Sequence, residues 1–93
     1  MIENFKSKET AKIFARQFSK KLPTTIQHIA FRKLRMLNQS SSLADLRIPP
    51  ANRLEALSGD RTGQYSIRIN QQWRICFKWK KGNAYDVEIT DYH

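Results

Sequence analysis

Tyr65-Ser-Ile-Arg-Ile-Asn70 and Trp73-Arg-Ile-Cys-Phe-Lys-Trp79 are two short runs in which apolar and polar residues alternate. The apolar side chains stand at odd positions and include β-branched and aromatic residues, whereas the even positions are mostly polar. Alternation with a period of two is typical of a β-strand with one buried and one open face. The two runs, joined by a few polar residues, therefore predict an antiparallel pair of strands.

A third alternating run follows the turn at Lys80-Lys-Gly-Asn83. Its apolar positions are Tyr85, Val87 and Ile89, and polar side chains stand between them. The three runs predict a three-stranded antiparallel meander whose odd-numbered face is apolar. The open face of this meander would present Arg68, Arg74 and Lys78.

Two amphipathic helices are expected upstream of the meander, because apolar residues recur there with helical spacing. The first begins after Ser7, which offers an N-cap, and ends at Leu22-Pro23. The second begins at Thr24 or Thr25. The apolar stripe of the first helix is Ala11, Phe14, Ala15 and Phe18, and that of the second is Ile26, Ile29, Ala30, Leu34 and Leu37. Off the second stripe, Arg32, Lys33 and Arg35 form a basic outer face.

Two helices followed by a meander predict an α+β fold: a small antiparallel sheet with both helices packed on one face. The N-terminal segment around Ile2 and Phe5 is expected to add an edge strand to the sheet. Residues 40–64 form a long connection, which we interpret as a partly ordered basic flap attached to the core by leucine and isoleucine side chains. Its apolar attachment points are Leu43, Leu46, Ile48, Leu54 and Leu57. No repeat or second domain interrupts residues 1–93.

The net charge is +9 over 93 residues, from 17 basic and 8 acidic side chains. Such an excess indicates a polyanionic partner, most often nucleic acid, although an acidic protein or a membrane surface also fits. The single cysteine, Cys76, excludes an internal disulfide and a cysteine-based zinc cluster. No apolar run resembles a signal peptide or a membrane span. We therefore expect a cytoplasmic protein without a metal or cofactor.

Arginines on the open sheet face suit a phosphodiester, because the planar guanidinium donates two hydrogen bonds and remains charged. RNA cleavage without a metal needs cations beside the phosphate and groups that take and give a proton. His93 is a candidate for the acid–base role, and Tyr92 for proton donation or base stacking. The alternative for Arg74 and Lys78 is an ordinary cross-strand pairing with Asp86 and Glu88. These patterns support a nucleic-acid-facing domain and leave enzyme and non-cutting binder both open.

The string from Asn52 to Trp79, with Leu-Ser-Gly-Asp-Arg-Thr-Gly63 and Asn70-Gln-Gln-Trp-Arg-Ile75 inside it, resembles the HigB toxins of the RelE/ParE superfamily. The terminal Asp91-Tyr92-His93 and the opening Met-Ile-x-x-Phe strengthen this resemblance. It implies a metal-independent endoribonuclease that enters the ribosomal A site, cleaves mRNA there and stops translation. It also implies a helix-turn-helix antitoxin of the HigA kind, and operator DNA bound only through the toxin–antitoxin complex.

The resemblance places Arg74 on the arginine that contacts the scissile phosphate, and Tyr92 and His93 on the terminal active-site pair. Asp91 lies beside that pair and Arg68 faces the same way as Arg74. The remaining expected RNA contacts are Arg53, Arg61, Lys78, Arg32, Lys33 and Arg35. Ser58 stands where some family members have a catalytic lysine, which leaves the general base unassigned. The alternative function is a non-cutting inhibitor, such as a gyrase poison of the ParE kind.

Overall fold

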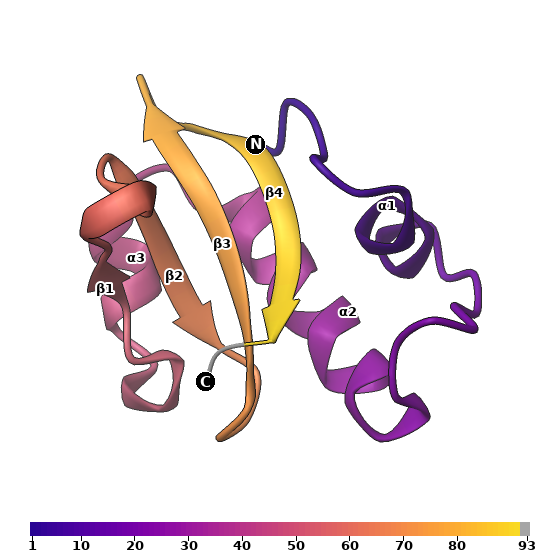
Figure 1. The fold of residues 1–93 in the computed structure, drawn as a ribbon. Helices are drawn as coiled ribbons and strands as arrows, with labels where there is room; N and C mark the ends of the chain where they lie inside the picture. The colour runs from indigo at the N-terminus through magenta and orange to yellow at the C-terminus, as the bar shows by residue number, and fades with distance from the viewer. Residues whose placement is uncertain (92–93) are drawn as a thin grey trace.

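Four antiparallel strands form one sheet in the order β1-β2-β3-β4 (Figure 1). The computed structural model describes residues 1–91 of the chain. The three expected strands are β2 (Gln64–Arg68), β3 (Trp73–Lys80) and β4 (Asn83–Asp91), which confirms the meander. The fourth strand, β1 (Glu55–Ala56), lies at the outer edge of β2, with Glu55 opposite Ser66.

The N-terminal segment lies along the opposite edge of the sheet, parallel to β4 (Figure 1). Two isolated bridges join Ile2 to Ala84 and Phe5 to Val87. The segment therefore occupies the expected edge, but it pairs only at these two points. The fourth strand comes instead from the long 40–64 connection.

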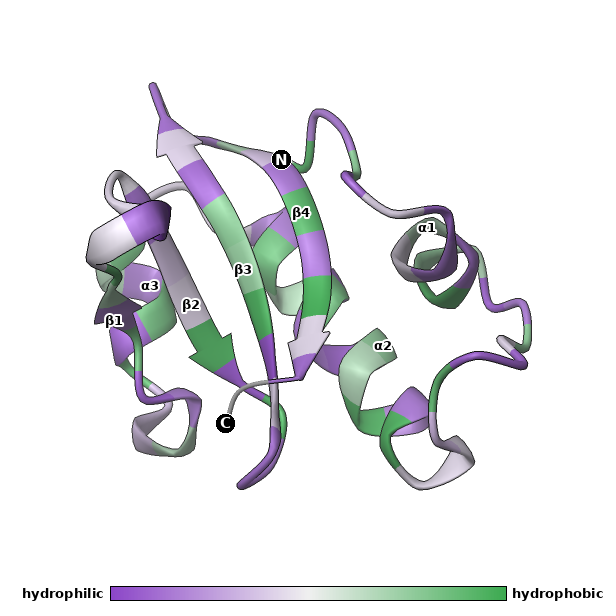
Figure 2. Cartoon of the chain, in the orientation of Figure 1, coloured by the Kyte–Doolittle hydropathy of each residue, from purple (hydrophilic) through white to green (hydrophobic). Residues whose placement is uncertain are grey.

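The helices α1 (Lys8–Phe14) and α2 (Thr24–Gln39) pack on the odd-numbered face of the sheet, as predicted. Four residues of α2, one turn apart, are buried in the core: Ile26, Ala30, Leu34 and Leu37. They meet strand residues such as Ile67, Ile75 and Phe77, which have no exposed surface. Figure 2 shows hydrophobic and hydrophilic residues alternating along β4, in keeping with a sheet that has one face against the helices.

The first helix is shorter than predicted, because its chain turns at Arg16. Ser7 is the N-cap, as expected, and accepts a hydrogen bond from the Thr10 amide. Arg16 has a φ of 62°, and its amide and that of Gln17 bond back to the last turn of α1, which is a Schellman ending. The predicted stripe is wrong at its end: Phe18 lies beyond the helix and is 62% exposed.

Residues 40–64 are more regular than a flap. They contain α3 (Leu43–Arg47), the 3-10 turns η1 (Pro50–Asn52) and η2 (Gly59–Arg61), and the strand β1. A reciprocal pair of bonds between Ser42 and Asp45 caps α3. Leu46 is fully buried, as predicted, whereas Ile48 is 77% exposed and does not attach the segment to the core.

A β-bulge in β4 corrects the predicted alternation there. Cys76 pairs with Glu88, but Lys78, two residues further along β3, pairs with Tyr85, three residues back along β4. The extra residue is Asp86, whose φ is 52°. Because the bulge shifts the phase of β4, Ala84 rather than Tyr85 is buried against the core.

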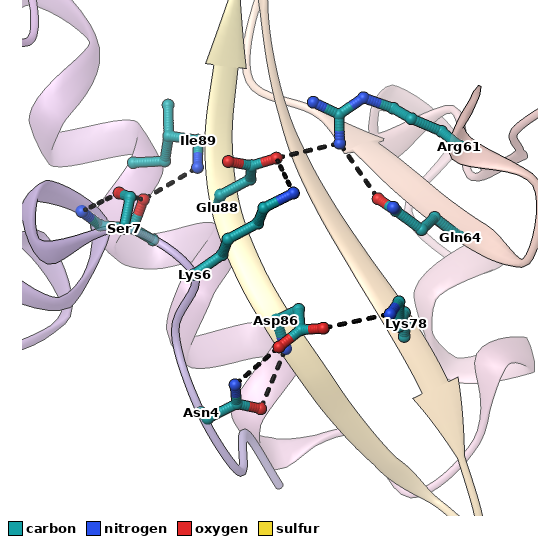
Figure 3. Close-up of polar contacts among 10 residues, drawn as sticks. Asn4, Lys6, Ser7, Arg61, Gln64, Lys78, Asp86, Glu88 and Ile89 are labelled. Carbon is teal, nitrogen blue, oxygen red and sulfur yellow. Dashed lines mark hydrogen bonds and ion pairs between the residues drawn. The ribbon is translucent and has the colours of Figure 1, made fainter.

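The side chain of Asn4 binds this bulge (Figure 3). It donates to the Asp86 carboxylate at 2.7 Å and accepts from the Asp86 amide at 3.0 Å. Lys78 pairs with the same carboxylate at 3.2 Å. The hydrogen bond from Asn4, followed by that from Lys78, lowers the pKa of the Asp86 carboxyl. The N-terminal segment and β4 are therefore joined by side chains as well as by backbone.

The even-numbered face of the meander is not open as predicted: Ser66, Arg74 and Cys76 are buried. Arg61 extends from η2 across β3 and pairs with Glu88 on β4 at 2.9 Å (Figure 3). Glu88 is the cross-strand partner of Cys76, so this ion pair lies over the middle of the sheet. The turns of residues 50–64 thus cover part of the face that alternation alone leaves to solvent.

Candidate active site

Arg74 lies near the start of β3, with only 5% of its surface exposed. Its Nε donates to the Ser66 hydroxyl at 2.7 Å, and its Nη2 donates to the Arg53 carbonyl at 2.6 Å. Its Nη1 lies 3.6 Å from the carboxylate of Glu55 on β1. Charged hydrogen bonds of this kind fix the plane of a guanidinium. Arg74 therefore has a defined orientation, and the predicted pairing with Asp86 or Glu88 does not occur.

The Arg53 carbonyl is itself positioned by a buried polar cluster. Arg53 has a φ of 45° and directly follows Asn52, which has no exposed surface. The Asn52 side chain accepts a hydrogen bond from the Lys33 ammonium and donates to the Leu46 carbonyl at 3.1 Å. Burial lowers the pKa of Lys33. Through this cluster, α2 and α3 fix the backbone that binds Arg74.

Arg68 is the direct cross-strand partner of Arg74, on the same face of the sheet. Its Nε donates to the Asn70 carbonyl at 3.0 Å, and the residue is half-buried. Two like charges directly opposite each other on neighbouring strands are unfavourable, and the Glu55 carboxylate beside Arg74 offsets part of this repulsion. The pair thus concentrates positive charge where β2 ends and β3 begins.

Strand β4 ends at the same end of the sheet as the connection between β2 and β3, because Asp91 pairs with Trp73, the first residue of β3. The Asp91 carboxylate accepts a hydrogen bond from the Gln72 side chain at 3.0 Å. Of the predicted catalytic set, the structure places Arg68 and Arg74 opposite each other on the outer face of the sheet. Asp91 lies at the same end of the sheet but, as the partner of Trp73, on the other face. Tyr92 and His93 lie outside the described residues.

Three predicted RNA contacts lie on or beside the outer face of the sheet. Arg53 is exposed next to Arg74. Arg61 is partly exposed and donates to both Glu88 and Gln64 (Figure 3). Lys78 is exposed and pairs with Asp86, which confirms for this lysine the cross-strand alternative. These three cations form a band beside Arg74.

The predicted contacts on α2 lie elsewhere. Since α2 packs its apolar stripe against the inner face of the sheet, its exposed side points away from Arg74. Arg32 and Arg35 are on that side, and Lys33 is turned toward Asn52. The two groups of cations predicted from sequence therefore belong to two surfaces.

Within residues 1–91, no group of three or more histidine, cysteine or acidic side chains has an arrangement that would hold a metal ion. In the same part of the chain, no helix combines the length and apolar character of a membrane span. Cys76 is a free cysteine, fully buried beneath the Arg61–Glu88 pair.

Sequence reasoning missed the residues that hold Arg74: Ser66, Glu55 and Asn52. Ser66 gave a weak signal, because it is a small polar residue at an even position of an alternating run. Asn52 gave none, since its partners Lys33 and Leu46 come from helices 19 and 6 residues away. Such long-range partners have no pattern in the sequence.

The arrangement of this sheet and its helices has been seen before in solved structures. The structure aligns with crystal structures of YafQ from E. coli, both the protein of strain BL21(DE3) and a mutant form, with a TM-score of 0.64 in each case. The alignments cover 98% of this chain and 91% of YafQ at 12% identity, a level at which the likeness concerns the fold alone.

Sequence comparison identifies the family. The model of HigB-like toxins, described as RelE-like toxins of the type II toxin–antitoxin system HigB, matches residues 3–93. Toxin HigB-1 of Vibrio cholerae is 41% identical over 71 residues, which cover 76% of this chain and 75% of the relative. Endoribonuclease HigB of Proteus vulgaris is 29% identical over the whole length of both chains. The chain belongs to the HigB-like toxins, and its partner is accordingly an antitoxin.

Proposed function

We propose that this toxin is a ribosome-dependent endoribonuclease that cleaves mRNA in the ribosomal A site and thereby stops translation. The observation that supports this most directly is the Arg68–Arg74 pair, two cations opposite each other on the outer face where β2 ends and β3 begins. Glu55 beside Arg74 offsets part of their mutual repulsion, and an anion bound between or above the two guanidiniums would relieve the rest. The phosphodiester of an RNA strand is such an anion.

Arg74 is assigned to the scissile phosphate, because its hydrogen bonds to Ser66 and Arg53 hold the guanidinium in place before substrate arrives. A preorganised cation stabilises the negative charge that develops on the phosphate oxygens, without a reorganisation cost during the reaction. Arg68 adds charge from the neighbouring strand. His93 would supply or take the proton, and Tyr92 would donate a proton or stack on a base.

The residue that acts as the general base is a separate part of the proposal. Ser58, at the position of a catalytic lysine in some relatives, caps η2 and is exposed. Arg61, which starts from the same turn, is tied to Glu88 and Gln64 through its Nη1. We therefore assign proton transfer to His93, and to Arg61 an electrostatic role.

The RNA strand is proposed to run over the outer band formed by Arg53, Arg61 and Lys78. Each of these cations has surface accessible to a phosphate, and none of them lies on the helical side of the sheet. A gyrase poison of the ParE kind is the alternative function. The relation to an endoribonuclease of the same family, along the whole chain, favours RNA cleavage.

The proposed partners follow from the same assignment. The antitoxin would be a helix-turn-helix protein of the HigA kind, and operator DNA would be bound only by the toxin–antitoxin complex. The toxin itself would contact the ribosome and mRNA, and hence act in the cytoplasm.

The decisive experiment maps RNA 5′ ends after the protein is added to a translating extract, beside the same mRNA without ribosomes. We expect new ends in frame within the coding region, and only with ribosomes, because a site without a strong base needs the ribosome to align its substrate. Loss of translation with intact mRNA would contradict the proposal and make DNA gyrase the next target.

A further inference from the structure

A hollow lies between the end of α1 and the start of α2, remote from Arg74. Its volume is about 460 Å³, and it is open to solvent. Arg16, Phe18 and Phe31 are among the residues that line it. A second hollow of similar volume, about 460 Å³, shares Phe31 and continues along α2 past Arg32 and Arg35.

The floor of the first hollow is apolar and partly uncovered. Phe18 is 62% exposed, whereas every other phenylalanine, tyrosine and tryptophan within residues 1–91 is buried or half-buried. Ile29, further along α2, is 37% exposed. Single exposed apolar residues are common, but Phe18 in the first hollow and Ile29 in the adjoining second one give a larger apolar surface of the kind that partner proteins cover.

The rim of the two hollows is basic. Arg16 places its guanidinium carbon 4.9 Å from the centroid of the Phe31 ring, and Arg35 lies over the same ring at 6.0 Å. With Arg32 and Lys33, four cations line the two hollows, and no aspartate or glutamate of the described chain does. The surface therefore complements a segment that is apolar on one side and acidic on the other.

The backbone at Arg16 supports a binding role for this surface. Arg16 adopts a left-handed conformation, which is unfavourable for a residue with a Cβ and is usually occupied by glycine. This turn ends α1 early, leaves Phe18 on the surface and puts Arg16 on Phe31. The unfavourable turn at Arg16 therefore lies at the point where the residues that line the hollow come together.

We propose that the α1–α2 hollow is the docking site of an acidic amphipathic helix of the antitoxin. An apolar side chain of that helix would enter beside Phe18, and its carboxylates would pair with Arg16, Arg32 and Arg35. A protein helix fits better than RNA, because the face of Phe31 is already covered by Arg16 and Arg35 and is not open to a stacking base. The proposal rests on membership of the type II toxins, not on the cleavage reaction.

The test measures binding of the toxin to the antitoxin encoded beside it, by titration calorimetry, for Phe18→Ser and Arg16→Gly. Arg16→Gly removes the guanidinium but suits the left-handed turn, so the fold is retained. Lys81→Gly is the matched control, because Lys81 is also an exposed cation with a positive φ, of 52°. We expect each of the two hollow variants to weaken binding at least about 30-fold, and Lys81→Gly to change it less than about twofold.

Cleavage in the translating extract is measured for the same three variants, and thermal unfolding shows that each remains folded. The proposal predicts unchanged cleavage in all three, so that loss of antitoxin binding is separate from loss of catalysis. Unchanged antitoxin affinity in both hollow variants would overturn the proposal. Lower cleavage with unchanged antitoxin affinity would also overturn it, and would assign the hollow to ribosomal RNA.

Discussion

Arg74 is held from three sides: by Ser66 on β2, by the carbonyl of Arg53 and by Glu55 on β1. Because Arg74 is buried, a substitution there affects the stability of the fold as well as the site. On an open face, removal of the side chain would leave the fold untouched, whereas here it leaves buried partners unsatisfied, at about 1–3 kcal/mol. Truncation to alanine would therefore lower both activity and stability, and the two effects could not be told apart. A substitution that retains the charge and most of the length of the side chain is the better probe.

Arg74→Lys is expected to lower ribosome-dependent cleavage at least about 100-fold, with the fold retained. A single ammonium lacks the planar fork that bonds Ser66 and Arg53 while still facing a phosphate. The measurement is the initial rate of mRNA cleavage in the translating extract. Lys80→Arg, an exposed change of the same type on the same strand, is the control and should stay within about threefold. Equal activity of Arg74→Lys and the wild type would refute the role of the guanidinium.

The bulge in β4 is the element that joins the N-terminal segment to the sheet. Asn4 contacts both the amide and the carboxylate of Asp86, and backbone bonds on either side link Lys6 to Val87 and Glu3 to Ala84. Because Asp86 has a positive φ, its conformation needs such support. The edge segment is therefore part of the folded unit in spite of its sparse pairing.

Asn4→Ala is expected to lower the free energy of unfolding by about 1 kcal/mol at neutral pH. The Asp86 carboxyl has a lowered pKa in the folded protein, so its contribution is present above its pKa in the unfolded chain. That contribution is lost as the pH falls through the folded pKa. Urea unfolding of both proteins at neutral and strongly acidic pH should show a difference that shrinks in acid. A difference that is the same at both pH values would show that the ionised Asp86 carboxylate does not contribute through Asn4. Gln39→Ala, a substitution of an exposed residue, is the control.

At the scale of the whole molecule, the net charge of +9 divides between two surfaces. One lies over the sheet around Arg74 and is proposed for RNA, and the other lies along α2 and is proposed for the antitoxin. Since the sheet and α2 stand back to back, one side of the toxin can be occupied while the other remains accessible (Figure 1). An antitoxin bound to the hollow would then act by keeping the toxin off the ribosome through its bulk, not by contact with Arg74.

Binding of the free toxin to an uncleavable single-stranded RNA with 2′-O-methyl groups should depend strongly on salt. Five phosphate contacts, by Arg53, Arg61, Arg68, Arg74 and Lys78, predict a loss of about 130-fold in affinity between 50 and 200 mM monovalent salt. Fluorescence anisotropy measures this, and Arg68→Ala should reduce the logarithmic slope by about 0.7. A flat salt dependence would exclude the proposed phosphate contacts.

Local sequence patterns were sufficient for the parts of the fold that depend on neighbours in the chain. Alternation in residues 65–79 predicted β2 and β3, helical spacing predicted the buried face of α2, and Ser7 marked the start of α1. Period and capping are properties of the local backbone, so they are visible in the sequence. The end of α1 was not predicted, because an arginine occupies the left-handed position that glycine usually marks.

The sequence by itself determined the α+β class, the inner face of the sheet and the family, and it marked Arg68 and Arg74 as candidates for the site. Only the tertiary structure decided that Arg74 is buried, since its Arg53 partner is 21 residues away and depends in turn on Asn52. The tertiary structure likewise decided that Arg61 crosses to Glu88, 27 residues away, and that the α2 cations face away from the site. Contacts between residues far apart in the chain depend on how the elements pack, and packing has no period that a sequence displays.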